Sequence, residues 1–125
     1  MEGLTLTVAD VKRSIAYYCT LGFDVEIDAA PPFALLRGGG GTIGLLSARE
    51  AAKDGGAALG LPQAKAIHVE LSTDDLDGLY AELTSKGVTV DVPPHDEPWE
   101  RSMTAFDPDG YSVEFAQGRR GENQT

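Results

Sequence analysis

The sequence predicts an α+β fold in which one strand–helix–strand–strand–strand unit occurs twice within a single domain. Two stretches that begin at Gly3 and at His68, 65 residues apart, align without a gap. Each has an alternating apolar run, then a helical stripe of apolar residues, then a glycine that can end a helix. This agreement at a constant offset indicates an internal repeat. The chain has 125 residues, which suits one domain.

The first element of each copy is predicted to be a strand with one buried face. Leu4, Leu6 and Val8 alternate with small or polar residues in the first copy, as Val69 and Leu71 do in the second. A period of two is typical of a strand that lies with one face on a core.

A capped helix is predicted to follow each of these strands. Asp10 in the first copy, and Asp74 or Asp75 in the second, can accept hydrogen bonds from the free amides of a first helical turn. Gly22 and Gly87 stand where a left-handed helix stop favours glycine. We therefore expect one helix between each carboxylate and its glycine.

Further strands are expected after each helix. Residues 23–27 and 88–92, in which apolar and polar residues alternate, are predicted strands closed by the Pro-Pro pairs at 31–32 and 93–94. Downstream, residues 40–46 align with 110–116 at an offset of 70, which places a five-residue insertion around residues 95–101.

The turns and the connection between the copies can also be located. The glycine run at 38–41 predicts a tight hairpin that corresponds to the Asp-Pro-Asp-Gly turn at 107–110. The modules are expected at about 3–46 and 67–117 within one domain over 1–125, joined by a linker at 47–66. Ser47 and Glu50 have capping-box spacing and predict a short helix there.

The charge balance is strongly acidic and restricts the classes of partner. Twenty Asp and Glu residues face ten Lys and Arg residues, for a formal net charge of −10. Such a surface repels nucleic acid and anionic membranes, so neither is expected as a partner, and it attracts organic cations. A generally solvated acidic surface is the alternative explanation. The lone Cys19 and the lack of an apolar run that could cross a bilayer favour a cytoplasmic protein.

Several motifs together resemble the vicinal oxygen chelate superfamily, which includes glyoxalase I, bleomycin resistance proteins and extradiol dioxygenases. They are Asp10 with the helix motif at 14–18, the Leu-Gly-Phe at 21–23, His68, and the Asp-Pro-Asp-Gly turn with its following strand at 106–115. The resemblance implies that the two βαβββ modules form a half-closed, eight-stranded cup with its cavity inside. It also implies that a second chain frequently completes the cup, so we expect a homodimer.

The resemblance also implies where a divalent metal would bind. In metal-dependent relatives, the first and last strands of each module supply the ligands, and these positions correspond here to Gly3, Gly44, His68 and Glu114. Glycine has no donor atom, and catalytic zinc sites use three protein ligands. We therefore expect no cofactor, although His68 and Glu114 could hold a divalent metal in an irregular site if Glu70, a second copy or His95 contributed.

The function implied is that of a non-enzymatic, metal-independent binder of a small organic ligand, of the bleomycin-resistance type, with a cationic antibiotic as one candidate ligand. Residues 97–101 resemble the Pro-Trp-x-Arg segment of those proteins. Trp99 could stack on a ligand, and Arg101 could meet a ligand oxygen. The candidate ligand-binding residues are Thr5, Thr7, His68, Glu70, Trp99, Arg101 and Glu114.

Alternatives remain open for the function and for individual residues. The chain could be a metal-dependent lyase, isomerase or dioxygenase, in which Glu114 would be the catalytic acid or base and His68 would tune its pKa. It could also be a scaffold without a ligand. His68 and Glu114 could instead bond to each other, Trp99 could plug the end of the cup, and Arg101 could pair with a neighbouring carboxylate from the set Asp96, Glu97 and Glu100.

Overall fold

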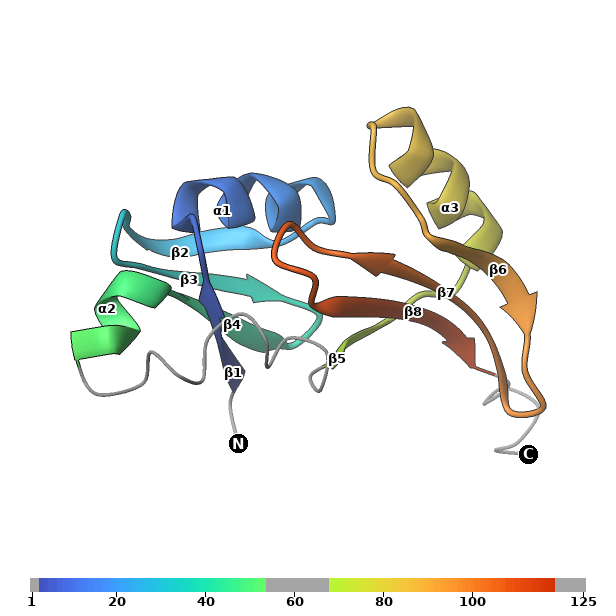
Figure 1. The fold of residues 1–125 in the computed structure, drawn as a ribbon. Helices are drawn as coiled ribbons and strands as arrows, with labels where there is room; N and C mark the ends of the chain where they lie inside the picture. Colours follow the sequence, from blue (N-terminus) through green and yellow to red (C-terminus); the bar gives the residue numbers. More distant parts are fainter. Residues whose placement is uncertain (1–2, 54–67, 119–125) are drawn as a thin grey trace.

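Two four-stranded sheets and three helices make up the described part of the fold. The computed structural model describes residues 3–53 and 68–118. The elements are, in order, β1 (Gly3–Val8), α1 (Val11–Thr20), β2 (Asp24–Ala29), β3 (Phe33–Gly38), β4 (Gly41–Ser47), α2 (Ala48–Lys53), β5 (His68–Ser72), α3 (Leu76–Ser85), β6 (Val92–Asp96), β7 (Glu100–Phe106) and β8 (Ser112–Gly118) (Figure 1).

The two sheets have the same topology, which confirms the repeat. The strand orders are β1-β4-β3-β2 and β5-β8-β7-β6. In each sheet the first and last strands pair in parallel, and the other pairs are antiparallel. The fold is therefore α+β with two βαβββ modules, as the sequence predicts.

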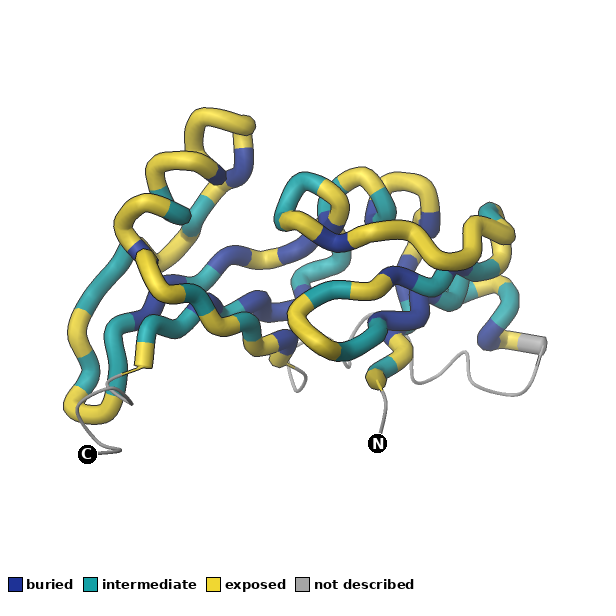
Figure 2. Tube along the Cα trace, turned by 180° about the vertical axis from the view of Figure 1, so that it is seen from behind, coloured by how far each residue is buried: buried dark blue, intermediate teal, exposed yellow. Residues whose placement is uncertain are grey.

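Each sheet buries one face under a helix. α1 covers the first sheet and α3 the second, and both helices lie on the same side of the molecule (Figure 1). The buried positions gather between helices and sheets (Figure 2). The largest fully buried side chains are Tyr18, Tyr111, Phe115, Leu6, Leu36, Leu45, Leu76, Leu83, Met103, Val8, Val11 and Val113. We call the side of each sheet opposite its helix the open face.

The predicted helix ends are confirmed. The Asp10 side chain accepts from the amide of Arg13 at 3.2 Å, and Asp75 accepts from the amide of Gly78 at 3.0 Å. Asp75 is therefore the cap of the second helix. Gly22 and Gly87 follow the helices with φ of 107° and 87°, a region that glycine enters at no steric cost.

One predicted strand is misplaced in the second module. Residues 88–92 were expected to form a strand closed by Pro93 and Pro94, but β6 begins at Val92 and contains both prolines. β6 is an edge strand whose register shifts between Val92 and His95. Proline cannot donate to a ladder and is tolerated at such an irregular edge, so here it does not end the strand. The matching strand of the first module, β2, lies close to its predicted place.

The connection between the modules is described only in part. α2 is the predicted short helix, and the Glu50 amide donates to the Ser47 hydroxyl at 2.9 Å. The rest of the predicted linker, 54–66, lies outside the described residues, as does the first residue of the predicted second module. Among the helices that the structure describes, none is long and apolar enough to cross a membrane.

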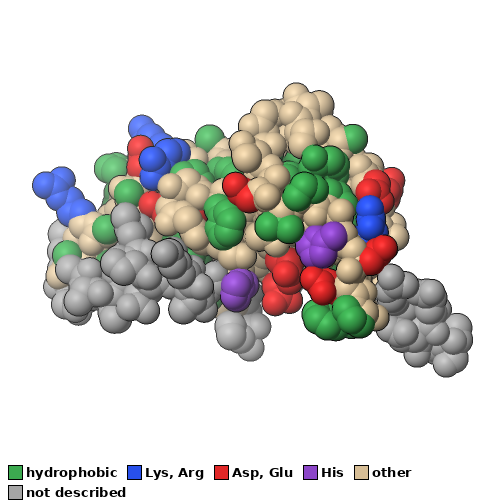
Figure 3. Space-filling view, turned by 45° about the vertical axis from the view of Figure 1, so that its right-hand side comes forward, with side chains coloured by type: hydrophobic (Ala, Val, Ile, Leu, Met, Phe, Trp, Pro, Cys, Tyr) green, Lys and Arg blue, Asp and Glu red, His purple; other side chains and the backbone are tan. Residues whose placement is uncertain are grey.

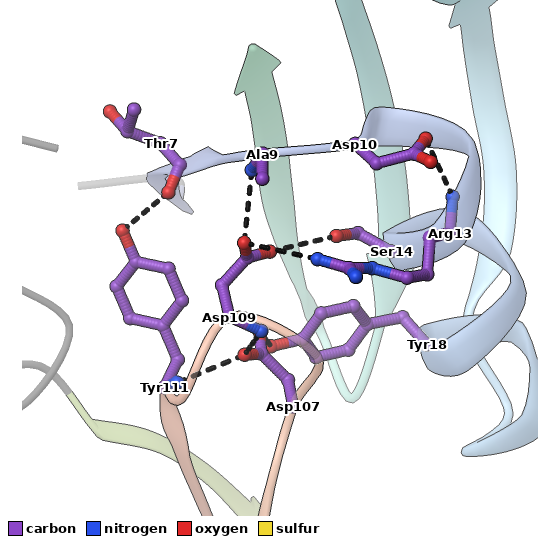
Figure 4. Close-up of polar contacts among 9 residues, drawn as sticks. All are labelled: Thr7, Ala9, Asp10, Arg13, Ser14, Tyr18, Asp107, Asp109 and Tyr111. Atoms are coloured by element: carbon purple, nitrogen blue, oxygen red, sulfur yellow. Dashed lines mark hydrogen bonds and ion pairs between the residues drawn. The ribbon is translucent and has the colours of Figure 1, made fainter. Parts of the chain in front are cut away.

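The loop between β7 and β8 joins the two modules. Asp109 lies with its carboxylate against the first module, where it accepts from the Ala9 amide at 2.9 Å, the Ser14 hydroxyl at 3.3 Å and Arg13 at 3.4 Å (Figure 4). Its side chain is 1% exposed.

Two tyrosine hydroxyls complete this junction. Tyr18 donates to Asp107 at 2.7 Å, and Tyr111 donates to the Thr7 carbonyl at 2.7 Å (Figure 4). Burial is the main cause that raises the pKa of Asp107, although its hydrogen bonds oppose this shift. We call Asp107, Asp109 and Tyr111 the inter-module clasp. It fixes the two sheets with their open faces on the same side of the molecule.

Candidate ligand-binding face

The open face of the second sheet is polar and acidic. Val69 of β5 is buried, so the alternation of the strand leaves His68 and Glu70 on the opposite, exposed face. Glu114 of β8 is the register partner of Glu70. Two carboxylates therefore stand side by side on neighbouring parallel strands.

Glu114 is the electrostatic centre of this face. Partial burial raises its pKa most, the carboxylates of Glu100, Glu70 and Glu97 raise it further, and His68 acts in the opposite direction. Acidic side chains gather on this part of the surface near the two histidines (Figure 3). We call Glu70, Glu97, Glu100 and Glu114 the acidic face. Because like charges repel, a bound cation would stabilise it.

His68 and Glu114 lie near each other without forming a bonded pair. Although His68 influences the pKa of Glu114, no hydrogen bond joins the two side chains in the described part of the chain. Both groups remain able to meet a ligand, and His68 is exposed.

The two glycines at the family metal positions are held in place by close neighbours. A Cβ on Gly3 would lie 3.0 Å from the carbonyl carbon of Thr42 and would overlap its carbonyl oxygen. A Cβ on Gly44 would lie 2.8 Å from the Thr5 hydroxyl and 3.3 Å from the Phe33 ring. Neither of these two positions therefore offers a side-chain donor atom or the space for one.

The described residues do not form a complete metal site. Over residues 3–53 and 68–118, no three His, Cys, Asp or Glu side chains lie close enough together to hold a metal ion. His68 and Glu114 are two of the four family positions, and a catalytic zinc site needs a third protein ligand.

Thr5 and Thr7 lie on the other open face. Thr5 is the register partner of Gly44 and occupies the space above it, next to Phe33. Thr7 is half-buried, and its carbonyl belongs to the junction with Tyr111. This face belongs to the first sheet, so the two threonines are not on the sheet that carries the acidic face.

Arg101 does not join the other candidates. Its guanidinium binds both carboxylate oxygens of Asp77 at 3.0 and 3.1 Å, and it also binds Asp96 at 3.1 Å. Asp77 belongs to α3, and the neighbouring Ser102 is buried on the opposite face. The alternation of β7 therefore directs Arg101 toward the helix side of the sheet. Of the predicted alternatives for this residue, pairing with Asp96 is the one that the structure contains.

Trp99 lies in the turn between β6 and β7 and is 63% exposed. The Glu97 amide donates to the Glu100 carbonyl at 2.7 Å and closes this turn. The indole ring is therefore free for stacking and does not plug an interior. The two ring nitrogens of His95 lie 2.9 Å from the Pro93 carbonyl oxygen and 3.0 Å from the Glu97 carboxylate.

Sequence reasoning missed Glu97 and Glu100 as members of the site. Both were placed in an insertion, whereas Glu100 begins β7. The sequence did contain a signal for Glu100, because Glu100, Ser102 and Thr104 alternate with a period of two. In the structure, Thr104 is the register partner of Glu114. Because alternate residues of a strand share a face, Glu100 lies on the same face of the sheet as Thr104 and Glu114.

Comparison with known proteins identifies the family. The profile of the Glyoxalase/Bleomycin resistance protein/Dioxygenase superfamily matches residues 2–115. The chain belongs to this superfamily. Similar solved structures include a glyoxalase/bleomycin resistance protein/dioxygenase from Nocardioides, which is 26% identical, with a TM-score of 0.77 and coverage of 92% of this chain and 80% of that one.

Two further similar structures are named for different activities. TnmS3, an antibiotic binding protein from Streptomyces sp. CB03234, is 25% identical with a TM-score of 0.70, and the match covers 94% of this chain and 95% of that one. Lactoylglutathione lyase from Agrobacterium tumefaciens is 20% identical with a TM-score of 0.75, and the match covers 93% and 91%. At 20% identity, the similarity to the lyase shows the fold alone.

Proposed function

We propose that this superfamily member is a metal-independent binding protein for a small organic cation, such as a cationic antibiotic, and not an enzyme. The observation that carries this proposal is the acidic face, where Glu70 and Glu114 are register partners on neighbouring parallel strands and their like charges repel. A cation placed between Glu70 and Glu114 would remove this repulsion. The exposed Trp99 adds an aromatic surface at the end of the same module.

The similarity to an antibiotic binding protein supports the same class of function. The packed glycines at two family metal positions support a site that holds its ligand without a metal. In the proposed site, Glu70, Glu114 and His68 contact the charged part of the ligand, and Trp99 stacks on an aromatic part.

We also propose that the functional unit is a cytoplasmic homodimer. The open face of the first sheet carries Phe33 and Leu35 beside Gly44, and it is less charged than the acidic face. A second copy could place this face, with Thr5 and Thr7, over the acidic face and so enclose a ligand. The single Cys19 suits a reducing compartment.

The test compares two ligands of the same shape. Binding of 1-methylquinolinium and of neutral quinoline at pH 7.5, followed by calorimetry and by Trp99 fluorescence in the presence of EDTA, isolates the effect of charge. We expect the cation to bind more tightly, and Glu114→Gln to weaken the cation without affecting quinoline. Glu82→Gln is the matched control because it removes one exposed carboxylate from α3. Equal binding of both ligands would exclude cation recognition.

A metal-dependent lyase, isomerase or dioxygenase is the second candidate, because His68 and Glu114 remain on one face. Elemental analysis of protein purified without chelator separates the two functions. We expect less than stoichiometric zinc, nickel, iron and manganese. Near-stoichiometric metal that is lost in His68→Ala would overturn the proposed function.

A further inference from the structure

A groove runs between the two modules along β5. It consists of two adjoining cavities of about 330 and 320 Å³. Both are lined by Phe23, Gly38, Gly39, Glu70 and Leu71. We call this pair of cavities the seam groove.

The groove exists because β5 is an edge strand. Among the strands of the described residues, β5 pairs with β8 alone, so its other edge faces the first module across the seam. The hairpin between β3 and β4 approaches that edge, and a Cβ on Gly39 would lie 3.8 Å from the Leu71 side chain. Gly39 and Gly40 have φ of 59° and 82°, which suits the tight two-residue turn. Because the tip of this hairpin consists of glycines, it places no side chain between the two modules.

The lining combines apolar side chains with glycine backbone, polar side chains and one carboxylate. Leu21, Leu79 and Phe115 join Phe23 and Leu71 in the first cavity. Among the described residues that line either cavity, none is Lys or Arg, and Glu70 is the acidic one. Such a surface favours an aliphatic chain that ends in a positive charge.

Glu70 connects the groove to the acidic face. It lines both cavities, and it is the register partner of Glu114. His68, which also belongs to the site, lines the second cavity. Leu71 and Leu79 lie on the helix side of β5, opposite the acidic face. A molecule whose cationic group is at Glu70 can therefore reach them by passing its apolar part around the edge of β5 through the groove.

We propose that the seam groove selects organic cations that carry an aliphatic arm, with the cation at Glu70 and the arm between Phe23 and Leu71. This inference rests on the proposed cation-binding function and adds the class of ligand. Its physical basis is the removal of methylene groups from water, which contributes about 0.8 kcal/mol for each one fully buried, or about four-fold in affinity.

The experiment measures binding of the primary alkylammonium ions from butyl to octyl by calorimetry, with the corresponding alkanols as uncharged controls. We expect affinity to rise with each methylene by up to about four-fold, the value for full burial. Glu70→Gln should weaken every ammonium ion equally and leave the alkanols unchanged. Leu71→Ala and Leu79→Ala should reduce the gain per methylene.

Ile15→Ala provides the matched control for these truncations. Ile15 is partly buried against the core from α1 and does not line the groove, so its truncation should lower stability without altering the dependence on chain length. Ammonium affinities that do not change with chain length would overturn the selectivity of the groove, while their loss in Glu114→Gln would still support cation binding. Alkanols that bind as tightly as the ammonium ions would overturn the proposed function itself.

Discussion

Two adjacent tyrosines of α1 have hydroxyl groups in opposite situations. The Tyr18 hydroxyl donates to Asp107 at 2.7 Å, whereas the buried Tyr17 hydroxyl has no hydrogen-bond partner among the described residues. The rings meet edge to face at 5.2 Å. Burial first, and the Asp107 carboxylate second, raise the pKa of both phenols, so both hydroxyls stay protonated. The Tyr18 hydroxyl is therefore a hydrogen-bonded donor, whereas the Tyr17 hydroxyl is buried without a partner among the described residues.

This difference predicts opposite effects of the same substitution. Tyr18→Phe should lower the free energy of unfolding by about 1–3 kcal/mol, because it leaves the buried Asp107 carboxylate without a donor. Tyr17→Phe should leave stability unchanged or raise it, because it removes a buried hydroxyl that lacks a partner. Urea unfolding of the two variants measures both values. A larger loss for Tyr17→Phe than for Tyr18→Phe would contradict the assignment of these hydrogen bonds.

The acidic face should lower stability as well as bind ligand. The pKa of Glu114 is raised above its ordinary value of 4.5 in the folded protein, so the folded state holds more protons than the unfolded state just above that pH. Stability from this group is therefore lost as pH rises from about 4.5 through the folded pKa.

Glu114→Gln should consequently be more thermostable than the wild-type protein at pH 7, and the difference should shrink as pH falls toward 4.5, because Glu114 in the folded protein takes up its proton above its ordinary pKa. Melting temperatures of both proteins across this range provide the measurement. A variant that is less stable than wild type at pH 7 would indicate that Glu114 makes a favourable contact in the folded state.

At the level of secondary structure, strand contacts leave no space for a larger side chain at Gly44, one of the family metal positions. β1 and β4 pair in parallel with Thr5 opposite Gly44, and Thr5 and Phe33 fill the space in front of that glycine. The pattern of alternation predicts that these residues share a face, but the sequence does not contain the distance between them. The tight packing of Gly44 could be learned only from the structure.

A double-mutant cycle tests this packing. Gly44→Ala should lower the free energy of unfolding by about 1–3 kcal/mol, because its Cβ meets Thr5 and Phe33 in an already filled space. Thr5→Ala in the same chain should recover part of the loss, because it removes the closer neighbour. Chemical unfolding of the two single variants and the double variant gives the coupling energy. Strictly additive losses would show that the two side chains do not compete for space.

Local signals in the sequence predicted most elements correctly. Asp10 and Asp75 begin their helices and Gly22 and Gly87 end them, because caps and stops depend on a few neighbouring residues. The prediction failed at Pro93, where pairing across the sheet decides the outcome. An edge strand with a register shift accepts a proline that a regular central strand would reject.

At the scale of the whole molecule, the resemblance predicted that the two modules form one eight-stranded cup, but the sequence did not reveal the contacts that join them. The repeat predicted two similar units, and the Asp-Pro-Asp-Gly motif predicted a turn. The same turn also supplies the inter-module clasp, through contacts that join Asp109 to Ala9 and Asp107 to Tyr18. These pairs are separated by 100 and 89 residues, so no local pattern could indicate them.

The clasp should make the two modules unfold together. Asp109→Ala removes one carboxylate that accepts from an amide, a hydroxyl and a guanidinium. It should lower stability by at least about 1–3 kcal/mol, because buried donors lose their acceptor. Thermal unfolding followed separately by Trp99 fluorescence and by circular dichroism should change from coincident to separate transitions. Coincident transitions in the variant would indicate that other contacts couple the modules.

The candidate site was predictable in its composition but only partly in its arrangement. His68, Glu70 and Glu114 lie on one face as the strand period predicts, whereas Arg101 points to the helix side and pairs with Asp77 of a separate element. Which partner a long side chain finds depends on the path of the whole chain.

The positions of two residues that each occur once in the chain have a practical consequence. Cys19 is exposed on α1 of the first module, and Trp99 is exposed in a turn of the second. A dye attached through maleimide chemistry to the thiol would accept excitation energy from the indole without any engineered label site. Its sensitised emission would follow the separation of the modules during refolding, and mixing labelled with unlabelled protein would distinguish transfer within a chain from transfer between chains.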